Sequence, residues 1–166
     1  DRNILEAIAD EKGINADTLH KYDEQPKKHV ISRTVRGFSN SIEQNIVEMQ
    51  FDYLRRKARS GESFVVVGRC SEIVLQEHPS LVSIFVLGEP HHKTERVMRI
   101  YHLTEEEAQQ KMARHDKSRK AYHNQYSKYH WGDSRNYDIC INSTTLGVDK
   151  TAEYLEKFIK AKFDLD

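Results

Sequence analysis

A glycine and an arginine that follow an apolar run are the first residues of this chain whose position suggests chemistry. The run is Phe-Val-Val-Val at residues 64–67, and Gly68 and Arg69 come directly after it. Four large apolar residues in succession predict a strand buried on both faces, as in a parallel sheet covered by helices. Ligands of such sheets bind beyond the carboxyl ends of the strands, where a permissive glycine and a forked guanidinium favour an anion. The alternative is a structural arginine that pairs with a nearby carboxylate such as Glu72.

A second set of charged residues lies on two consecutive predicted helices. The set comprises Arg96, Arg99, Arg114, Asp116, Lys117, Arg119 and Lys120. Asp116 is spaced to pair with Arg119 or Lys120 and to hold a guanidinium in one orientation. Several arginines that converge on one anion stabilise phosphoryl transfer, because the transition-state charge is spread over oxygens. The alternative is a solvated helix face with ion pairs such as Glu95 to Arg99.

Histidines, cysteines and aromatic residues give weaker signals. The nine histidines form no HExxH pattern, so we predict surface histidines and no protein metal site. Cys70 and Cys140 are too few for a disulfide framework and predict buried, reduced thiols. The aromatic residues Tyr122, Tyr126, Tyr129 and Trp131 are predicted to form a core stripe rather than a stacking platform.

Hydrophobic spacing and capping residues divide the chain into helices and strands. A first helix is predicted to end at Gly13, and Asn15 is a candidate cap for a second. A longer helix is predicted between Ser41, which has capping-box spacing with Gln44, and Gly61, and Thr104 and Glu107 have the same capping-box spacing at the start of a later helix. Further strands are predicted at residues 81–87 and 137–142, further helices at 71–76, 91–101, 104–126 and 148–159, and a turn at 131–133.

Strands that alternate with helices predict an α/β fold, with a parallel sheet that has helices on both faces. We expect a single domain over residues 1–166. Within it we expect a core at 41–90 and 134–163, a flap at 23–40 and a helical lid at 91–130.

The bulk composition excludes two classes of partner. The 26 basic residues are balanced by 26 acidic residues, so no global basic field favours nucleic acid. No apolar run approaches the roughly 20 residues that span a bilayer, and the N-terminus has no signal-peptide pattern. We therefore expect a cytoplasmic protein that binds neither membranes nor nucleic acids.

Long phrases of the sequence resemble the bacterial cytidylate kinase-like proteins, which belong to the nucleoside monophosphate kinase group of P-loop proteins. The resemblance extends over residues 1–159. The matching phrases are FVVVGRCSEIVL, SIFVL, ERVMRIYHLTEEEAQQKMARHDKSRKAYHNQY and HWGDSRNYDICINSTTLG. It implies a transferase that moves the terminal phosphoryl group of ATP, with magnesium, to a nucleoside monophosphate substrate. In this scheme Gly68 and Arg69 match the strand-end pair that meets the monophosphate.

The resemblance also implies a lid. Arg114, Asp116 and Arg119 match the motif whose arginines close over the phosphates, and Arg96 matches an arginine on the helix that leads into the lid. Residues 27–40 correspond to the monophosphate-binding flap. We expect the two arginines of the lid motif and the strand-end arginine to face a common cleft at the carboxyl edge of the sheet.

The chain departs from the family pattern at its most specific motif. These 166 residues contain no GxxxxGK[ST] loop. In the family that loop precedes a segment resembling residues 1–5, and its strand lies between the strands matching 64–67 and 82–87. We therefore expect a chain that lacks the P-loop and its central strand, in which 64–67 and 82–86 are not paired.

Two other functions stay open beside the kinase. The first is a non-catalytic nucleotide-binding or regulatory domain that has the lid but no ATP chemistry. The second is a structural or partner-binding α/β module, in which the arginines form only a solvated face.

Overall fold

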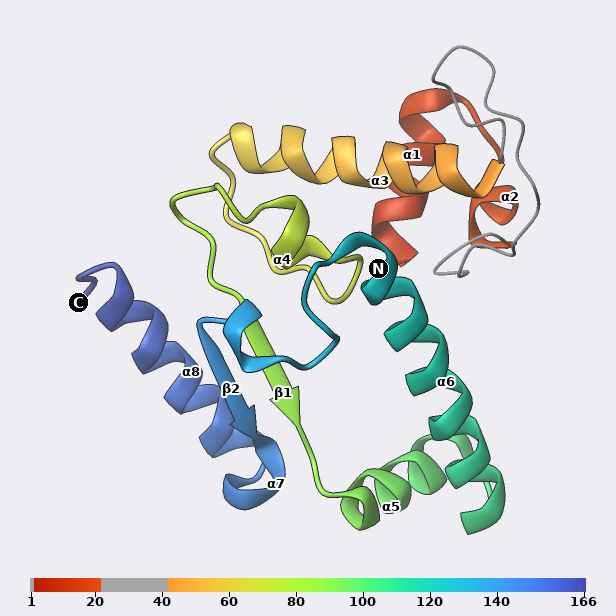
Figure 1. Ribbon diagram of the computed structural model, residues 1–166, viewed down its shortest axis with the longest axis vertical. Coiled ribbons are helices and arrows are strands. Elements are labelled where there is room, and N and C mark those ends of the chain that lie inside the picture. The colour runs from red at the N-terminus through yellow and green to blue at the C-terminus, as the bar shows by residue number, and fades with distance from the viewer. Residues whose placement is uncertain (1, 22–41) are drawn as a thin grey trace. The chain divides into compact units, whose positions relative to one another are not determined.

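A computed structural model describes residues 2–21 and 42–166 (Figure 1). The predicted flap at 23–40 and the predicted cap Ser41 lie outside these ranges. The elements are α1 (Arg2–Lys12), α2 (Ala16–Lys21), α3 (Ile42–Arg59), α4 (Ser71–Val74), β1 (Ile84–Leu87), α5 (Pro90–Tyr101), α6 (Glu105–Tyr126), the 3₁₀ turn η1 (Ser134–Asn136), β2 (Ile139–Asn142), α7 (Ser143–Leu146) and α8 (Val148–Lys162). Helices dominate this mixed α/β chain.

The chain divides into two compact units. The first unit combines Asp1–Leu81 with Ser118–Trp131, and the second combines Val82–Lys117 with Gly132–Asp166. Helix α6 therefore contributes its first part to the second unit and its last turns to the first. The predicted division into core, flap and lid follows other boundaries and stays a prediction.

The helices of the first unit form where local signals predict them. Gly13 follows α1 with a φ of +64°, and Asn15 Oδ1 accepts a hydrogen bond of 2.8 Å from the amide of Asp17 at the start of α2. Leu5 of α1, Leu19 of α2 and Ile46 of α3 are buried in one apolar cluster. This burial, worth roughly 1.5–3 kcal/mol for each large side chain, holds the three helices together.

The predicted buried strand at residues 64–67 is wrong. Residues 62–67 have no regular secondary structure, and their side chains alternate. Phe64 and Val66 are partly buried beside a hollow of about 260 Å³ formed with α1 and α3, whereas Val65 is 93% exposed and Val67 63% exposed. A strand needs a neighbour to bond its backbone, and no described strand lies in this unit. The segment is therefore covered on one face only.

The second unit contains a parallel pair of strands. β1 and β2 pair in register from Ile84 with Ile139 to Leu87 with Asn142. Residues 64–67 take no part in this sheet, which confirms that they do not pair with the strand at 82–86. Among the described residues the sheet has two strands, fewer than the three-stranded sheet that the sequence predicts.

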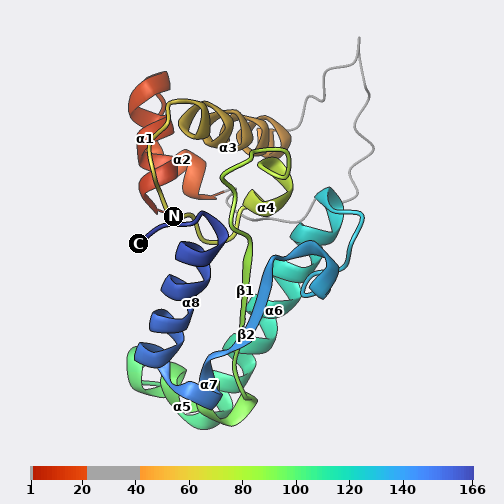
Figure 2. The same ribbon diagram turned by 90° about the vertical axis from the view of Figure 1, so that its left-hand side faces the viewer.

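Helix α8 runs back along the sheet after β2 (Figures 1 and 2). Near its end, Lys162 Nζ donates to Asp138 Oδ1 at 2.8 Å, just before the start of β2. Asp138 Oδ2 also accepts from the Ser83 amide at 2.7 Å and from the Ser83 hydroxyl at 3.0 Å. The Asp138 carboxylate thus contacts residues just before β1 and near the end of α8, as expected for a helix that runs antiparallel to β2.

Thr104 and Glu107 form the predicted capping box of α6. Glu107 Oε2 accepts from the Thr104 amide at 2.8 Å and the Thr104 hydroxyl at 2.9 Å, and the Glu107 amide donates to Thr104 Oγ1 at 3.3 Å. Thr94 of α5 and Ala108 of α6 are both buried within the second unit.

Over the described residues, every helix is too short or too polar to cross a membrane.

Candidate functional site

Gly68, Arg69 and Cys70 form a left-handed turn at the end of the extended segment. Their φ angles are +77°, +62° and +50°, and the Ser71 amide closes the turn with a 3.2 Å hydrogen bond to the Gly68 carbonyl. Arg69 and Cys70 pay about 1–2 kcal/mol each for this conformation, because their Cβ atoms crowd the backbone. Such backbone strain concentrates at functional sites, where the surrounding structure maintains it.

The turn places the side chain of Arg69 inside the first unit. Arg69 is 3% exposed, and its Nη1 donates to Gln50 Oε1 at 3.2 Å. Burial lowers the pKa of the guanidinium, and the neighbouring Tyr122 partly offsets this effect. Arginine nevertheless stays protonated in proteins, so the turn carries a buried positive charge.

Gln50 is a site residue that the sequence reasoning missed. It lies on α3 between Ile46 and Leu54 at four-residue spacing, and all three side chains are buried. A polar residue inside an apolar helix stripe was the available signal, since a buried amide needs a polar partner. Gln50 is 1% exposed, and the Oε1 atom of its amide accepts from Arg69.

The prediction of surface histidines is wrong for His123. Its Nε2 lies 2.7 Å from Glu72 Oε1, and the two side chains are 6% and 13% exposed. This contact ties α4, directly after the arginine turn, to the last turn of α6. A buried polar contact of this kind stabilises by roughly 1–3 kcal/mol against loss of one partner.

The aromatic residues beside His123 belong to the core, as predicted. Tyr122 is 3% exposed in a cluster with Val47 and Cys70, and Tyr126 meets Phe51 edge to face with ring centroids 5.3 Å apart. Cys70 belongs both to this cluster and to the arginine turn, so the cluster anchors one end of the turn. The other thiol corrects a prediction: Cys140 of β2 is exposed.

The remaining candidate arginines are on the surface. Arg96 and Arg99 of α5 and Arg114 and Arg119 of α6 are exposed, and none of these four makes an ion pair within residues 2–21 and 42–166. Over the described ranges their charges are therefore solvent-exposed and outside any ion pair.

The acidic residues near these arginines have partners other than the predicted ones. Asp116 lies 3.9 Å from Lys93 of α5, and Glu95 lies 3.5 Å from His91. The predicted pairs of Asp116 with Arg119 or Lys120 and of Glu95 with Arg99 are wrong. Both observed contacts are solvent-exposed and contribute about 0–1 kcal/mol each.

The predicted convergence of Arg69, Arg114 and Arg119 stays a prediction. Arg69 and Arg119 belong to the first unit and Arg114 to the second. Arg114 and Arg119 are five positions apart on α6, which separates them by roughly 140° around an ideal helix axis.

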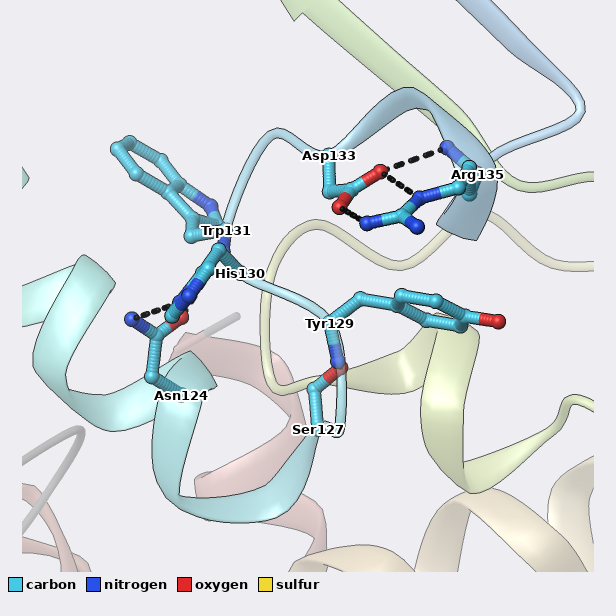
Figure 3. A network of polar contacts seen from close by, with 7 residues as sticks. All are labelled: Asn124, Ser127, Tyr129, His130, Trp131, Asp133 and Arg135. Atoms are coloured by element: carbon cyan, nitrogen blue, oxygen red, sulfur yellow. Dashed lines mark hydrogen bonds and ion pairs between the residues drawn. The ribbon is translucent and has the colours of Figure 1, made fainter.

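The chain after α6 is held by short-range polar contacts (Figure 3). Asn124 Oδ1 accepts from the Trp131 amide at 2.8 Å, and the Asn124 amide lies 3.4 Å from His130 Nδ1. Farther along, Asp133 Oδ1 accepts from Arg135 Nε at 2.9 Å and Asp133 Oδ2 from Arg135 Nη2 at 2.6 Å. Neighbours in sequence supply these contacts, so the network shapes the turn that returns the chain to β2.

Gly132 occupies the predicted turn at residues 131–133. Its φ is +82°, and a Cβ at this position would lie 3.1 Å from the ring of Phe85 in β1. Any other residue here would strain the backbone and displace the Phe85 ring, so the position favours glycine.

The described residues offer no ready site for a metal. No group of three or more His, Cys, Asp or Glu side chains in residues 2–21 and 42–166 is arranged to hold an ion. The sequence also has no GxxxxGK[ST] loop to cradle the β- and γ-phosphates of ATP or to supply a hydroxyl to magnesium. These residues do not fit an ATP–magnesium site by themselves.

Comparison with known proteins assigns the family. No curated protein sequence matches this chain. The crystal structure of an uncharacterized protein from Eubacterium ventriosum is similar, with a TM-score of 0.71, 34% sequence identity, and coverage of 95% of this chain and 90% of that chain. The model of the cytidylate kinase-like family matches residues 1–145. The chain belongs to the cytidylate kinase-like family.

Proposed function

We propose that the protein is a nucleoside monophosphate kinase-like phosphotransferase, and that this chain binds the acceptor nucleotide through Arg69. The observation that carries the proposal is the burial of this arginine in a left-handed turn, at 3% exposure. Family membership supplies the reaction class, and the turn supplies the residue that meets the phosphate.

A buried arginine in a strained turn suits recognition of a phosphate. The guanidinium is a rigid fork of donors whose geometry matches phosphate oxygens. Its position is set before a ligand arrives, by the backbone of residues 68–70 and by Gln50, so less conformational entropy is lost on binding. Low local dielectric also strengthens its attraction to an anion.

The exposed arginines suit the later stage of the same reaction. Arg96, Arg114 and Arg119 have no ion pair within the described residues that would have to break before they close over phosphates. In this proposal they contribute little to the first binding of the acceptor and most to the charge that develops during transfer. Asp116, half exposed beside Lys93, orients a neighbouring cation rather than the substrate.

The proposal assigns no residue of this chain to ATP or magnesium. Bound ATP and magnesium would supply the phosphoryl group and its charge neutralisation, and the family resemblance implies both. In that resemblance the P-loop strand lies beside residues 64–67.

Binding measurements test the acceptor site directly. Titration of the protein with cytidine monophosphate, cytidine and inorganic phosphate separates recognition of the base from recognition of the phosphate. We expect cytidine monophosphate to bind at least tenfold more tightly than cytidine, because a charge-assisted contact is worth about 1.5–3 kcal/mol. Repeating the titration with the other nucleoside monophosphates identifies the acceptor base.

A turnover assay of the full-length protein with ATP separates the kinase from a nucleotide-binding domain. Phosphate-dependent binding without turnover would favour the non-catalytic domain. Equal binding of cytidine and cytidine monophosphate would overturn the proposed role of Arg69.

A further inference from the structure

We propose that Gln50 is a second phosphate-binding residue, which orients Arg69 through its carbonyl oxygen and offers its amide nitrogen to the same phosphate. This inference rests on the proposed function, since it takes Arg69 as the residue that meets the monophosphate. It adds a residue from α3, 19 positions away in sequence, to a site otherwise built from the turn at 68–70.

The orientation of the Gln50 amide follows from the chemistry of its neighbour. A guanidinium has only donors, so the group that meets Arg69 Nη1 at 3.2 Å must be the oxygen, Oε1. The amide nitrogen, Nε2, then points to the other side of the same planar group. Nε2 is buried and has no hydrogen-bond partner in the described part of the chain.

A buried donor without an acceptor requires an explanation. Leaving such a group unsatisfied costs roughly 1–3 kcal/mol, and folded proteins do so rarely. Nε2 belongs to the same amide that holds Arg69, so it lies close to the guanidinium. Two neighbouring donor groups, one of them cationic, are complementary to an oxyanion. A phosphate oxygen would accept from Nε2 and also interact with the guanidinium of Arg69.

The choice of an amide over a carboxylate points in the same direction. If the only role of residue 50 were to hold a buried arginine, glutamate would do so more strongly, through a charged pair. A carboxylate would also neutralise the guanidinium and repel an incoming phosphate. Glutamine holds the arginine in place without adding a negative charge of its own beside the guanidinium.

Substitution of Gln50 separates a structural role from a binding role. Gln50→Glu keeps the acceptor for Arg69 but replaces the donor with a negative charge. We expect this variant to melt at or above the temperature of the unchanged protein and to bind cytidine monophosphate at least tenfold more weakly. Gln50→Met keeps the volume and removes both polar atoms, and we expect a loss of affinity without the charge repulsion. Gln76→Glu adds the same charge at an exposed site of the same unit and serves as the control.

The pH dependence adds a signature that lost packing would not produce. Lowering the pH protonates the introduced carboxyl, so the affinity ratio between the unchanged protein and Gln50→Glu should fall toward one. Comparison at each pH removes the effect of protonating the ligand itself.

The outcomes distinguish this inference from the proposed function. If the unchanged protein binds cytidine monophosphate more tightly than cytidine, and Gln50→Glu does so equally well, Gln50 is structural and the inference is wrong. If the unchanged protein shows no phosphate-dependent binding, the proposed function fails and the inference fails with it. A stable Gln50→Glu variant that has selectively lost phosphate-dependent binding supports both.

Discussion

The arginines of this chain occupy two contrasting environments. Arg69 is 3% exposed, lies in a left-handed turn and bonds to a buried glutamine. Arg96, Arg114 and Arg119 are exposed on long helices and make no ion pair within residues 2–21 and 42–166. One region fixes a guanidinium before any ligand arrives, and the other leaves its guanidinium groups to the solvent.

The difference indicates two ways of using the same side chain. A buried arginine loses its solvation when the protein folds, so the cost of desolvation is met before binding. An exposed arginine keeps its solvation and its side-chain entropy until a ligand orders it. We therefore expect the buried arginine to control affinity and the exposed arginines to control turnover. The predictions below test this division, beginning with the largest expected effect.

Removing the buried arginine should have the largest effect on binding. We expect Arg69→Ala to weaken cytidine monophosphate binding by about 100-fold, which corresponds to about 2.7 kcal/mol. Affinity for cytidine should change little, because it carries no phosphate. Calorimetric titration measures both, with Arg59→Ala as an exposed control in the same unit. If a folded Arg69→Ala protein binds cytidine monophosphate with unchanged affinity, the buried arginine does not control affinity and the proposed division of roles is wrong.

Breaking the contact beneath the arginine turn should lower stability. His123→Leu removes a buried partner of Glu72, and we expect the free energy of unfolding to fall by about 2 kcal/mol. Urea unfolding at neutral pH measures the loss. The control is His102, which lies at the C-cap of α5 and is exposed. It makes no such buried contact, so its substitution should change stability much less. An unchanged free energy of unfolding in His123→Leu would show that this contact does not stabilise the turn.

Removing an exposed arginine should affect turnover and leave stability alone. We expect Arg119→Ala to lower kcat about tenfold in the full-length protein, with a smaller change in KM, since lid contacts strengthen in the transition state. The free energy of unfolding should change by at most about 0.5 kcal/mol, as for other surface substitutions. Steady-state kinetics beside a melting curve test both parts. A change in KM alone would place Arg119 with Arg69 as an affinity residue.

The smallest expected effect is on stability, and it concerns the carboxylate of Asp138, to which we assign a role in the fold and none in ligand binding. Desolvation raises the pKa of Asp138, but hydrogen bonds from Lys162 and Ser83 outweigh it and hold the pKa below its ordinary value. The carboxylate therefore stabilises the fold above its unfolded pKa of about 3.9, and this contribution is lost as the pH falls through the folded pKa. We expect Asp138→Asn to cost less than about 1 kcal/mol at pH 7. That difference should shrink as the pH falls below about 4, and a difference independent of pH would contradict the assignment.

Several elements were predictable from residues that are neighbours in sequence. Asn15 marks the start of α2 and Thr104 with Glu107 the start of α6, because capping bonds join residues two or three positions apart. The location of Gly68 and Arg69 at the end of an apolar segment also followed from the sequence. The apolar character of 64–67 did not reveal that only one face would be covered, because that depends on which elements pack beside it.

The sequence by itself located most of the helices, placed β1 and β2 within the predicted segments 81–87 and 137–142, and identified which arginines are candidates for an anion. Only the tertiary structure decided that Arg69 is buried against Gln50, 19 positions away, and that His123 meets Glu72 across 51 positions. Helix capping and hydrophobic periodicity depend on residues a few positions apart, so they can be recognised in the amino-acid sequence. Burial and long-range pairing depend on which helix faces meet when the chain folds, and no spacing rule within one segment specifies that choice.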